Sequence, residues 1–345
     1  QATYVQLLNK QQELNIMKAS AQGNVRIVDH AFVPELPVAP RKTLITLLSA
    51  LVAGALASVW CLFRENTRQG ITSSDEIEAL DLEVSALVPY SKIQQKRDTL
   101  KRTLTSSNGR SSYLLANENA TDTAVEAIRA LRTNIYFSML DAKNNVLMIT
   151  GAAPEAGKSF ISSNLATVIA QSGKKVLLID ADMRKGYLEQ LFSTHVAPGL
   201  SELLSGEASP VEAVQQTDIE NLFFISHGNY TQSSSELLMN KRLGDLIEQA
   251  SKRYDYVIID TPPVLAVTDA AIVGQHVGMT LMVARYGYTT AQDLDNAARR
   301  LVQSNINIKG VILNGIKRDA FNSYNCYSYG SYTAGSDKKA AKSKG

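Results

Sequence analysis

Short apolar runs alternate with amphipathic stretches over residues 121–320. The runs are rich in Val, Ile and Leu, and in chain order they read NVLMIT, KVLLID, NLFFIS, YVIID, MTLMVA and KGVILN. Between them lie helical patterns such as SFISSNLATVIAQSG and TAQDLDNAARRLVQSN. Continuous apolar strands separated by helices are typical of a mostly parallel sheet covered on both faces. The pattern predicts a doubly wound α/β domain over 121–320, opening with a helix that Thr123 and Glu126 cap.

One earlier run is apolar throughout. LITLLSALVAGALASVWCLF, Leu44–Phe63, holds 20 residues without a charge, about the length that crosses a hydrocarbon core of ~30 Å. A buried core helix is the alternative, but such helices rarely stay apolar on every face. The run therefore predicts one transmembrane helix over 43–63.

Basic residues predict the orientation of that helix. Two precede it and seven follow it: Arg41 and Lys42, then Arg64, Arg68, Lys92, Lys96, Arg97, Lys101 and Arg102. Because Lys and Arg accumulate on the cytoplasmic side, residues before about 43 are expected to be extracytoplasmic and the residues after the helix cytoplasmic.

Residues 1–42 begin with a stretch that fits a helix only loosely. A short strand is predicted over 23–33, and a proline-rich segment then leads into the membrane.

The remaining segments are polar. Residues 64–120 read as a juxtamembrane segment and linker, with a possible helix start where Ser73 and Glu76 can form a capping box. Residues 321–345 read as a flexible tail.

Because the chain begins with Gln and has no signal-like start, we expect a fragment or a processed chain. A net charge of +2 argues against nucleic-acid binding, and two cysteines exclude a disulfide framework.

A phosphate-binding loop follows the first strand of the α/β domain. GAAPEAGKS, Gly151–Ser159, has Ala152 where the strict P-loop pattern requires glycine. Its place between a strand and a helix still suits phosphate binding, because loop N–H groups and the helix N-terminus attract anions. The predicted nucleotide-binding residues are Gly151, Ala152, Ala153, Pro154, Glu155, Ala156, Gly157, Lys158, Ser159, Phe160 and Asn314. For Asn314, contact with the adenine edge and an ordinary turn role are both open.

Carboxylates end two of the strands. KVLLIDADMR delivers Asp180 and Asp182, and YDYVIIDTPP delivers Asp260. A single such Asp is usually a helix cap or a surface charge, but ligands of open parallel sheets bind where the strands end. We predict that ATP and Mg²⁺ bind here, that Ser159, Asp180, Asp182 and Asp260 hold the metal, and that Asp180 takes the proton of an attacking hydroxyl. The predicted catalytic residues are Lys158, Asp180, Asp182 and Asp260.

Four tyrosines crowd the tail sequence SYNCYSYGSY: Tyr324, Tyr327, Tyr329 and Tyr332. Ser, Asn, Cys and Gly spacers are expected to keep them exposed, and each phosphate would add nearly two negative charges. Roughly eight residues separate the last strand from Tyr324, a reach of at most ~27 Å. The tail could enter the site of its own or of a neighbouring subunit.

The P-loop, LLIDAD, IIDTPP and the tyrosine-rich tail together resemble the bacterial tyrosine kinases of capsule and exopolysaccharide export, the Wzc type. The resemblance covers nearly the whole chain, since NVRIVDHAFVPELPVAPRKT and the apolar run resemble the exit of the family's polysaccharide co-polymerase module. It implies an inner-membrane tyrosine autokinase that phosphorylates the tail cluster, mainly on a neighbour in a homo-oligomeric ring, and so controls polymer length and export.

The resemblance also implies partners and further site residues. The partners are a cognate low-molecular-weight tyrosine phosphatase, an outer-membrane polysaccharide exporter and a polymerase. EAIRALRTNIYF matches the family's subunit-contact helix, with Glu126, Arg129 and Arg132 on its motif positions, although an intrahelical ion pair is the plainer interpretation of these residues. Tyr187 matches an internal regulatory tyrosine or is an ordinary half-buried phenol. His227 stands where some relatives carry Arg, and the segment before SELL lacks their prolines.

Two other function classes fit part of the sequence. A switch ATPase of the septum-site or partitioning class would carry a lysine at Ala153 and would lack both the apolar run and the tyrosine tail. A non-enzymatic chain-length scaffold would bind ATP without turnover, an interpretation that four intact residues disfavour: Lys158, Asp180, Asp182 and Asp260.

Overall fold

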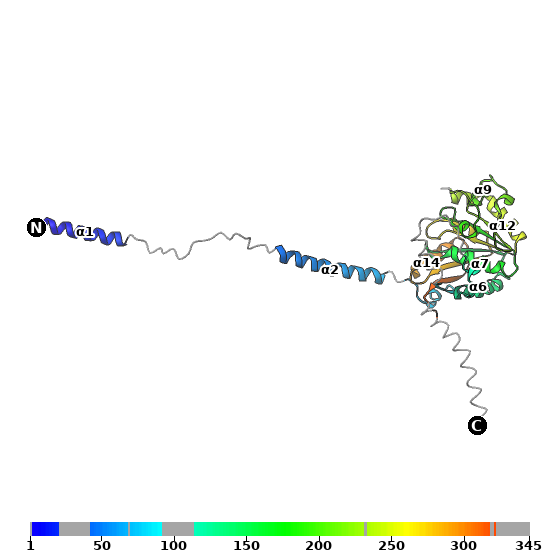
Figure 1. Ribbon diagram of the computed structural model, residues 1–345, viewed down its shortest axis with the longest axis horizontal. Coiled ribbons are helices and arrows are strands. Elements are labelled where there is room, and N and C mark those ends of the chain that lie inside the picture. The colour runs from blue at the N-terminus through cyan, green and yellow to red at the C-terminus, as the bar shows by residue number, and fades with distance from the viewer. Residues whose placement is uncertain are drawn as a thin grey trace, which may run out of the picture. The chain divides into compact units, whose positions relative to one another are not determined.

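The computed structural model describes residues 2–20, 42–67, 70–91, 114–230, 233–317 and 321 (Figure 1). The chain divides into two compact units, Gln1–Glu65 and Asn66–Gly345. Several predicted features lie outside the described residues: the strand over 23–33, the proline-rich segment, most of the linker and the tail tyrosines.

The described part of the first unit contains two helices. Helix α1 (Ala2–Ser20) is more regular than the loose sequence pattern indicated, and none of its residues is buried. Helix α2 (Lys42–Thr67) covers the predicted transmembrane segment and extends four residues beyond it. Its stretch Leu44–Cys61 is long and apolar enough to cross a membrane and is not buried by the protein.

The described part of the second unit is built on one sheet of eight strands: β1 (Val84–Pro89), β2 (Val146–Gly151), β3 (Val176–Asp180), β4 (Gln215–Gln216), β5 (Leu222–Ile225), β6 (Tyr256–Asp260), β7 (Met279–Arg285) and β8 (Ile308–Ile316). The order across the sheet is β1-β8-β7-β2-β6-β3-β5-β4. All neighbours are parallel except β4 and β5, which are antiparallel. The predicted mostly parallel sheet is confirmed.

Helices cover both faces. They are α3 (Asp75–Glu78), α5 (Leu115–Glu118), α6 (Thr123–Met139), α7 (Lys158–Ala170), α8 (Leu188–Phe192), α9 (Leu200–Ser205), α10 (Pro210–Ala213), α11 (Ser234–Leu238), α12 (Lys241–Arg253), α13 (Asp269–Gly274) and α14 (Ala291–Gln303). Alternate residues of a strand enter different core clusters: Val146 and Met148 of β2 pack with α9 and α11–α14, and Leu147 and Ile149 pack with α5–α8. This alternation buries both faces of the sheet, as a doubly wound fold requires.

Two details of the predicted boundaries were wrong. The cap of α6 is Asp122, whose side chain accepts a hydrogen bond from the backbone N–H of Ala124 at 2.9 Å, one residue before the predicted Thr123. The sheet also begins well before Thr121, because β1 pairs in parallel with β8. Part of the predicted juxtamembrane segment and linker therefore belongs to the folded unit.

The segment before β1 is fixed to the turn that follows β7. The backbone N–H of Ile71 donates to the carbonyl of Thr289, and the N–H of Gly287 donates to the carbonyl of Ile71, both at 2.8 Å. A Cβ atom at Gly70 would lie 2.3 Å from the backbone of Gly287, so only glycine allows this approach. Ile71 itself is fully buried in the core.

We expect Ile71→Ala to lower the free energy of unfolding by about 2–5 kcal/mol, because it leaves a cavity beside the sheet. Val211→Ala is the control: Val211 is 81% exposed, so its truncation should change stability by less than about 0.5 kcal/mol. Urea unfolding of the two variants checks this. Equal effects would mean that residues 70–91 are only loosely attached.

Candidate active site

The phosphate-binding loop lies between β2, at the centre of the sheet, and α7, which begins at Lys158. Gly157 closes the loop with φ +90°, in the left-handed region that favours glycine. A Cβ at Gly151 would lie 2.8 Å from the carbonyl oxygen of Val283 and 3.3 Å from Cδ of Lys158. The stem of Lys158 thus packs along the end of β2, and the residue is only 8% exposed. The backbone N–H groups of the loop and the N-terminus of α7 are thus together in a place that suits phosphate binding.

Two carboxylates stand beside this loop. Asp180 and Asp260 end the neighbouring parallel strands β3 and β6, where they are register partners, and each is 1% exposed. Ser159 Oγ donates to Asp260 Oδ2 at 2.6 Å. Asp180 accepts hydrogen bonds from the backbone N–H groups of Asp182, at 3.1 Å, and Leu188, at 3.4 Å. Of the three carboxylates predicted to meet the loop, Asp260 contacts it through Ser159, and Asp180 lies beside Asp260 as its register partner.

Burial changes the acidity of both carboxyl groups. It raises the pKa of Asp180 well above its ordinary value, and the negative charge of Asp260 raises it further. Burial also raises the pKa of Asp260 to about 6, although the charge of Lys158 and the hydrogen bond from Ser159 act in the opposite direction. Two crowded carboxylates at low exposure make this end of the sheet a place where a cation is stabilising.

These groups fit a hard divalent cation. Asp260 Oδ1 is buried and has no hydrogen-bond partner in the described part of the chain, so one carboxylate oxygen remains for a metal. No three His, Cys, Asp or Glu side chains of the described residues are placed to hold an ion by themselves. This agrees with a metal held by one or two carboxylates together with substrate phosphates.

A cavity of about 550 Å³ opens in front of the loop. Its lining includes Gly157, Lys158 and Ser159 of the loop, and Asp182, Arg184, Lys185 and Tyr187 of the segment after β3. Pro262, Pro263 and Val267 supply an apolar wall. Asp182 is partly occupied as a turn residue, since its Oδ1 accepts the backbone N–H groups of Arg184 and Lys185 at 3.3 and 3.0 Å. The cavity therefore combines cations, carboxylates and an apolar surface.

A second cavity of about 210 Å³ lies on the other side of Gly157 and is lined by Phe160, Arg285 and Asn314, among others. The amide nitrogen of Asn314 donates to the carbonyl of Ala156 at 3.1 Å, and Arg285 donates to the carbonyl of Glu155 at 3.2 Å. Both side chains therefore fix the phosphate-binding loop. The side chains of Ala152 and Ala156, which the sequence assigned to nucleotide binding, are buried in the core.

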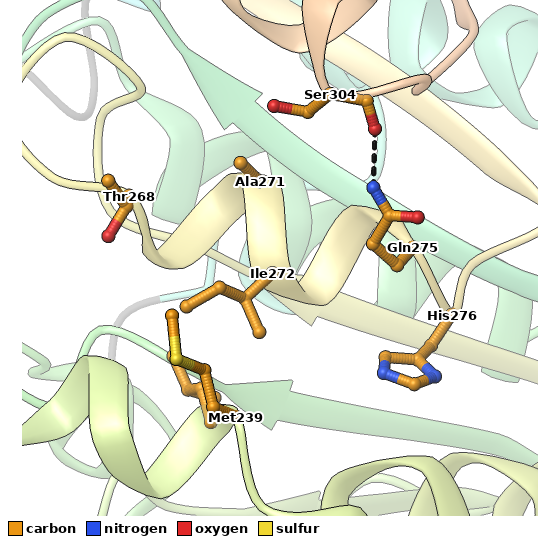
Figure 2. Close-up of a pocket in the computed structure, with 8 residues that line it drawn as sticks. Met239, Thr268, Ala271, Ile272, Gln275, His276 and Ser304 are labelled. Carbon is orange, nitrogen blue, oxygen red and sulfur yellow. Dashed lines mark hydrogen bonds between the residues drawn. The ribbon is translucent and has the colours of Figure 1, made fainter.

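A third cavity, of about 470 Å³, lies among α11, α13 and the residue that follows α14 (Figure 2). Figure 2 shows Gln275 donating to the backbone of Ser304 at its edge. No Lys, Arg, Asp or Glu lines it, so it lacks the charged groups that phosphate chemistry needs. Among the residues that the structure describes, none of the predicted site residues borders it.

The residues predicted on α6 lie apart from these three cavities. Glu126 and Arg129 on α6 form an ion pair with each other, as the plainer interpretation expected. Arg129 also donates to the carbonyl of Ala120 at 2.9 Å, and Arg132 to that of Val168 at 3.4 Å. Tyr187 lines the main cavity and is 45% exposed.

Two contacts between titratable side chains were not predicted from the sequence. His227, beyond the end of β5, lies 3.6 Å from the buried carboxylate of Glu189. Arg184 lies 3.6 Å from Asp269, which is fully buried. Each pair joins distant parts of the chain, so no local spacing signals it. The only sequence signal was the closeness of Arg184 to the strand-end carboxylates.

Comparison with known proteins connects this geometry to a family. Residues 1–66 match the family described as "G-rich domain on putative tyrosine kinase", and residues 146–309 match an AAA domain. The chain is 48% identical to the tyrosine-protein kinase wzc of Salmonella typhi, over 98% of this chain and 47% of that protein. It thus spans about half the length of the curated relatives it matches.

Solved kinase domains share the fold. The kinase domain of the Escherichia coli tyrosine kinase ETK is 44% identical, with a TM-score of 0.67, and the match covers 72% of this chain and 96% of that domain. The BceF tyrosine kinase domain is 46% identical, with a TM-score of 0.67, covering 72% of this chain and all of that domain. The predicted resemblance is confirmed, and the chain belongs to the family of bacterial tyrosine kinases.

Proposed function

We propose that this chain carries an ATP-dependent protein tyrosine autokinase that phosphorylates Tyr324, Tyr327, Tyr329 and Tyr332. The observation that carries the proposal is that Lys158 and Ser159 line one cavity while Ser159 donates to the buried Asp260, whose register partner is Asp180. The likeness to tyrosine kinases at 44–48% identity supports tyrosine as the acceptor.

The roles follow from the chemistry of each group. The loop N–H groups and Lys158 bind the phosphates of ATP, and Ser159, Asp260 and Asp182 hold Mg²⁺. Mg²⁺, when bound, offsets the negative charge on the phosphoryl group during transfer. The γ-phosphorus–oxygen bond to ADP breaks as a bond to the phenol oxygen forms, and Asp180 accepts the phenol proton. A raised pKa suits Asp180 to that task, because it makes the carboxylate a stronger base.

The membrane and polysaccharide setting is part of the proposal. Helix α2 spans the bacterial inner membrane, with the kinase domain and tail cytoplasmic and the residues before about 43 extracytoplasmic. Subunits form a homo-oligomeric ring through Glu126, Arg129 and Arg132, and phosphorylation of the tails controls capsule or exopolysaccharide polymerisation and export. The partners are a low-molecular-weight tyrosine phosphatase, an outer-membrane exporter and a polymerase. Support comes from the match of residues 1–66 and the kinase relatives.

Mass spectrometry of the full chain after incubation with Mg²⁺ and ATP tests the proposal. We expect phosphate on the peptide that contains residues 324–332, and at least about a hundred-fold less in Lys158→Met, which loses the phosphate-binding cation. Lys174→Met removes an exposed lysine and is the matched control, expected to behave as the parent.

Two outcomes would contradict the proposal. ATP consumption without tyrosine modification would indicate a switch ATPase. Nucleotide binding with neither turnover nor transfer would indicate a scaffold.

A further inference from the structure

A fully buried carboxylate stands behind the wall of the main cavity. Asp269 is the first residue of α13 and is 0% exposed. Two hydroxyl groups at the start of α11 donate to it: Ser234 Oγ to Oδ2 at 3.1 Å and Ser235 Oγ to Oδ1 at 2.5 Å. A buried carboxyl group is stable only when it is paired and hydrogen-bonded, and these two contacts hold the side chain of Asp269 in place.

The charge that faces Asp269 belongs to Arg184. Its Nε lies 3.6 Å from Asp269 Oδ2, and its Nη2 donates to Ser235 Oγ at 3.4 Å. That Nε is buried and has no hydrogen bond within the described residues, so the ion pair fixes this end of the guanidinium and the hydrogen bond from Nη2 fixes the other. Asp269 and Ser235, neither of which lines the main cavity, therefore orient Arg184.

The other side of Arg184 meets the cavity. The residue lines the same 550 Å³ space as Lys158 and Ser159, and its side chain is 35% exposed. It stands on the loop after β3, where its backbone N–H donates to Asp182. Guanidinium groups carry five donors in a planar fork that suits phosphate oxygens, and contacts to Asp269 and Ser235 occupy only part of that fork.

We propose that Asp269 and Ser235 are positioning residues that hold Arg184 against the terminal phosphate of a bound nucleoside triphosphate. The inner phosphates belong to the loop and to the N-terminus of α7, which line the same cavity. Arg184 stands beside Asp182 and not on the loop, so its guanidinium would contact the terminal phosphate, which the loop does not enclose. The terminal phosphate is the group that is transferred. Arg184 thereby distinguishes ATP from ADP, and its charge also offsets that of the nearby carboxylates during transfer. The inference rests on the nucleotide-dependent function proposed above.

Equilibrium binding to the full chain tests it, using ADP and a non-hydrolysable ATP analogue, each with Mg²⁺. Arg184→Gln should weaken binding of the analogue at least about ten-fold, the usual effect of losing a hydrogen bond to a charged group. Binding of ADP should change less than about two-fold, because ADP lacks the terminal phosphate. Asp269→Asn should shift the analogue in the same direction, and Ser235→Ala should do so by a smaller factor.

The chain offers a matched control. Asp295 and Arg299 form an exposed pair on α14, 2.9 Å apart, and line none of the three cavities described above. Asp295→Asn and Arg299→Gln should leave the affinity for both nucleotides unchanged. Because Asp269 is buried, ADP binding serves as the folding check for Asp269→Asn, and Ser235→Ala tests the same contact with a smaller change.

Several results would overturn the inference. Equal losses for ADP and the analogue would assign Arg184 and Asp269 a structural role only. An unchanged affinity for the analogue, with a raised KM for the acceptor peptide, would assign Arg184 to the acceptor instead. A parent chain that binds neither nucleotide would refute the proposed function itself, whereas a parent that binds both beside unresponsive variants refutes only this inference.

Discussion

Asp260→Asn is expected to raise the free energy of unfolding of the metal-free protein at pH 7 by about 1–3 kcal/mol, while reducing tyrosine phosphorylation at least about a hundred-fold. The gain arises because burial raises the pKa of Asp260 to about 6, so that keeping it ionised opposes folding. The loss arises because an amide is a much poorer metal ligand than a carboxylate. Greater stability with less activity is common where active-site charges are held under strain.

The raised pKa of Asp260 determines how the stability difference between variant and parent depends on pH. The folded protein binds the Asp260 proton more tightly than the unfolded chain does, so the destabilisation is absent below about pH 4 and grows as pH rises through about 6. The variant should therefore match the parent in acid and exceed it at neutral pH. Urea unfolding without metal or nucleotide, over a range of pH, measures the difference. Asp218→Asn, at an exposed position, serves as the control, and a difference that does not vary with pH would refute the explanation.

Gly157→Ala is expected to weaken nucleotide binding by about 10- to 100-fold. The residue has φ +90°, and an added Cβ would lie 2.1 Å from the amide nitrogen of Asn314. Alanine must therefore leave this conformation or displace Asn314, which holds the loop through Ala156. Strain of this kind amounts to about 1–3 kcal/mol, which corresponds to that range of affinity.

Gly173→Ala is the control that separates backbone strain from the clash with Asn314 in the phosphate-binding loop. Gly173 has φ +85° in the turn after α7, and nothing lies within 4 Å of an added Cβ. Its alanine variant should lose stability but keep the nucleotide affinity of the parent. Titration with ADP and Mg²⁺ compares the two variants, and equal losses of affinity would mean that the contact with Asn314 is unimportant.

The central strands could be predicted because each is a continuous apolar run. All six expected runs are strands, and Asp180 and Asp260 meet because parallel neighbours end at the same edge of the sheet. Strand β1 escaped prediction because VSALVP is short, ends in proline and is only partly buried. Proline is tolerated there because β1 is an edge strand. Tertiary pairing with β8 thus overrode a weak local signal.

The charged pairs around the cavity could not be predicted for a different reason. Asp269 lies in a sequence that reads as an ordinary helix start, and only the packing of α11 against α13 brings Ser234 and Ser235 to its carboxylate. Its ion pair with Arg184 joins residues 85 positions apart. Motifs identify groups that act where a strand meets a loop, but they do not identify the groups that orient them.

The pairing of β1 with β8 has a practical consequence for fragments of this chain. A fragment that begins at Thr121 would expose the hydrogen-bonding edge of β8, a nine-residue strand, because β1 occupies that edge in the folded unit. Long uncovered strand edges pair with other chains and cause aggregation. The opposite edge is ended by the two-residue β4, which is too short to recruit a neighbour. Soluble fragments of the catalytic domain should therefore begin before Gly70 and retain the edge strand.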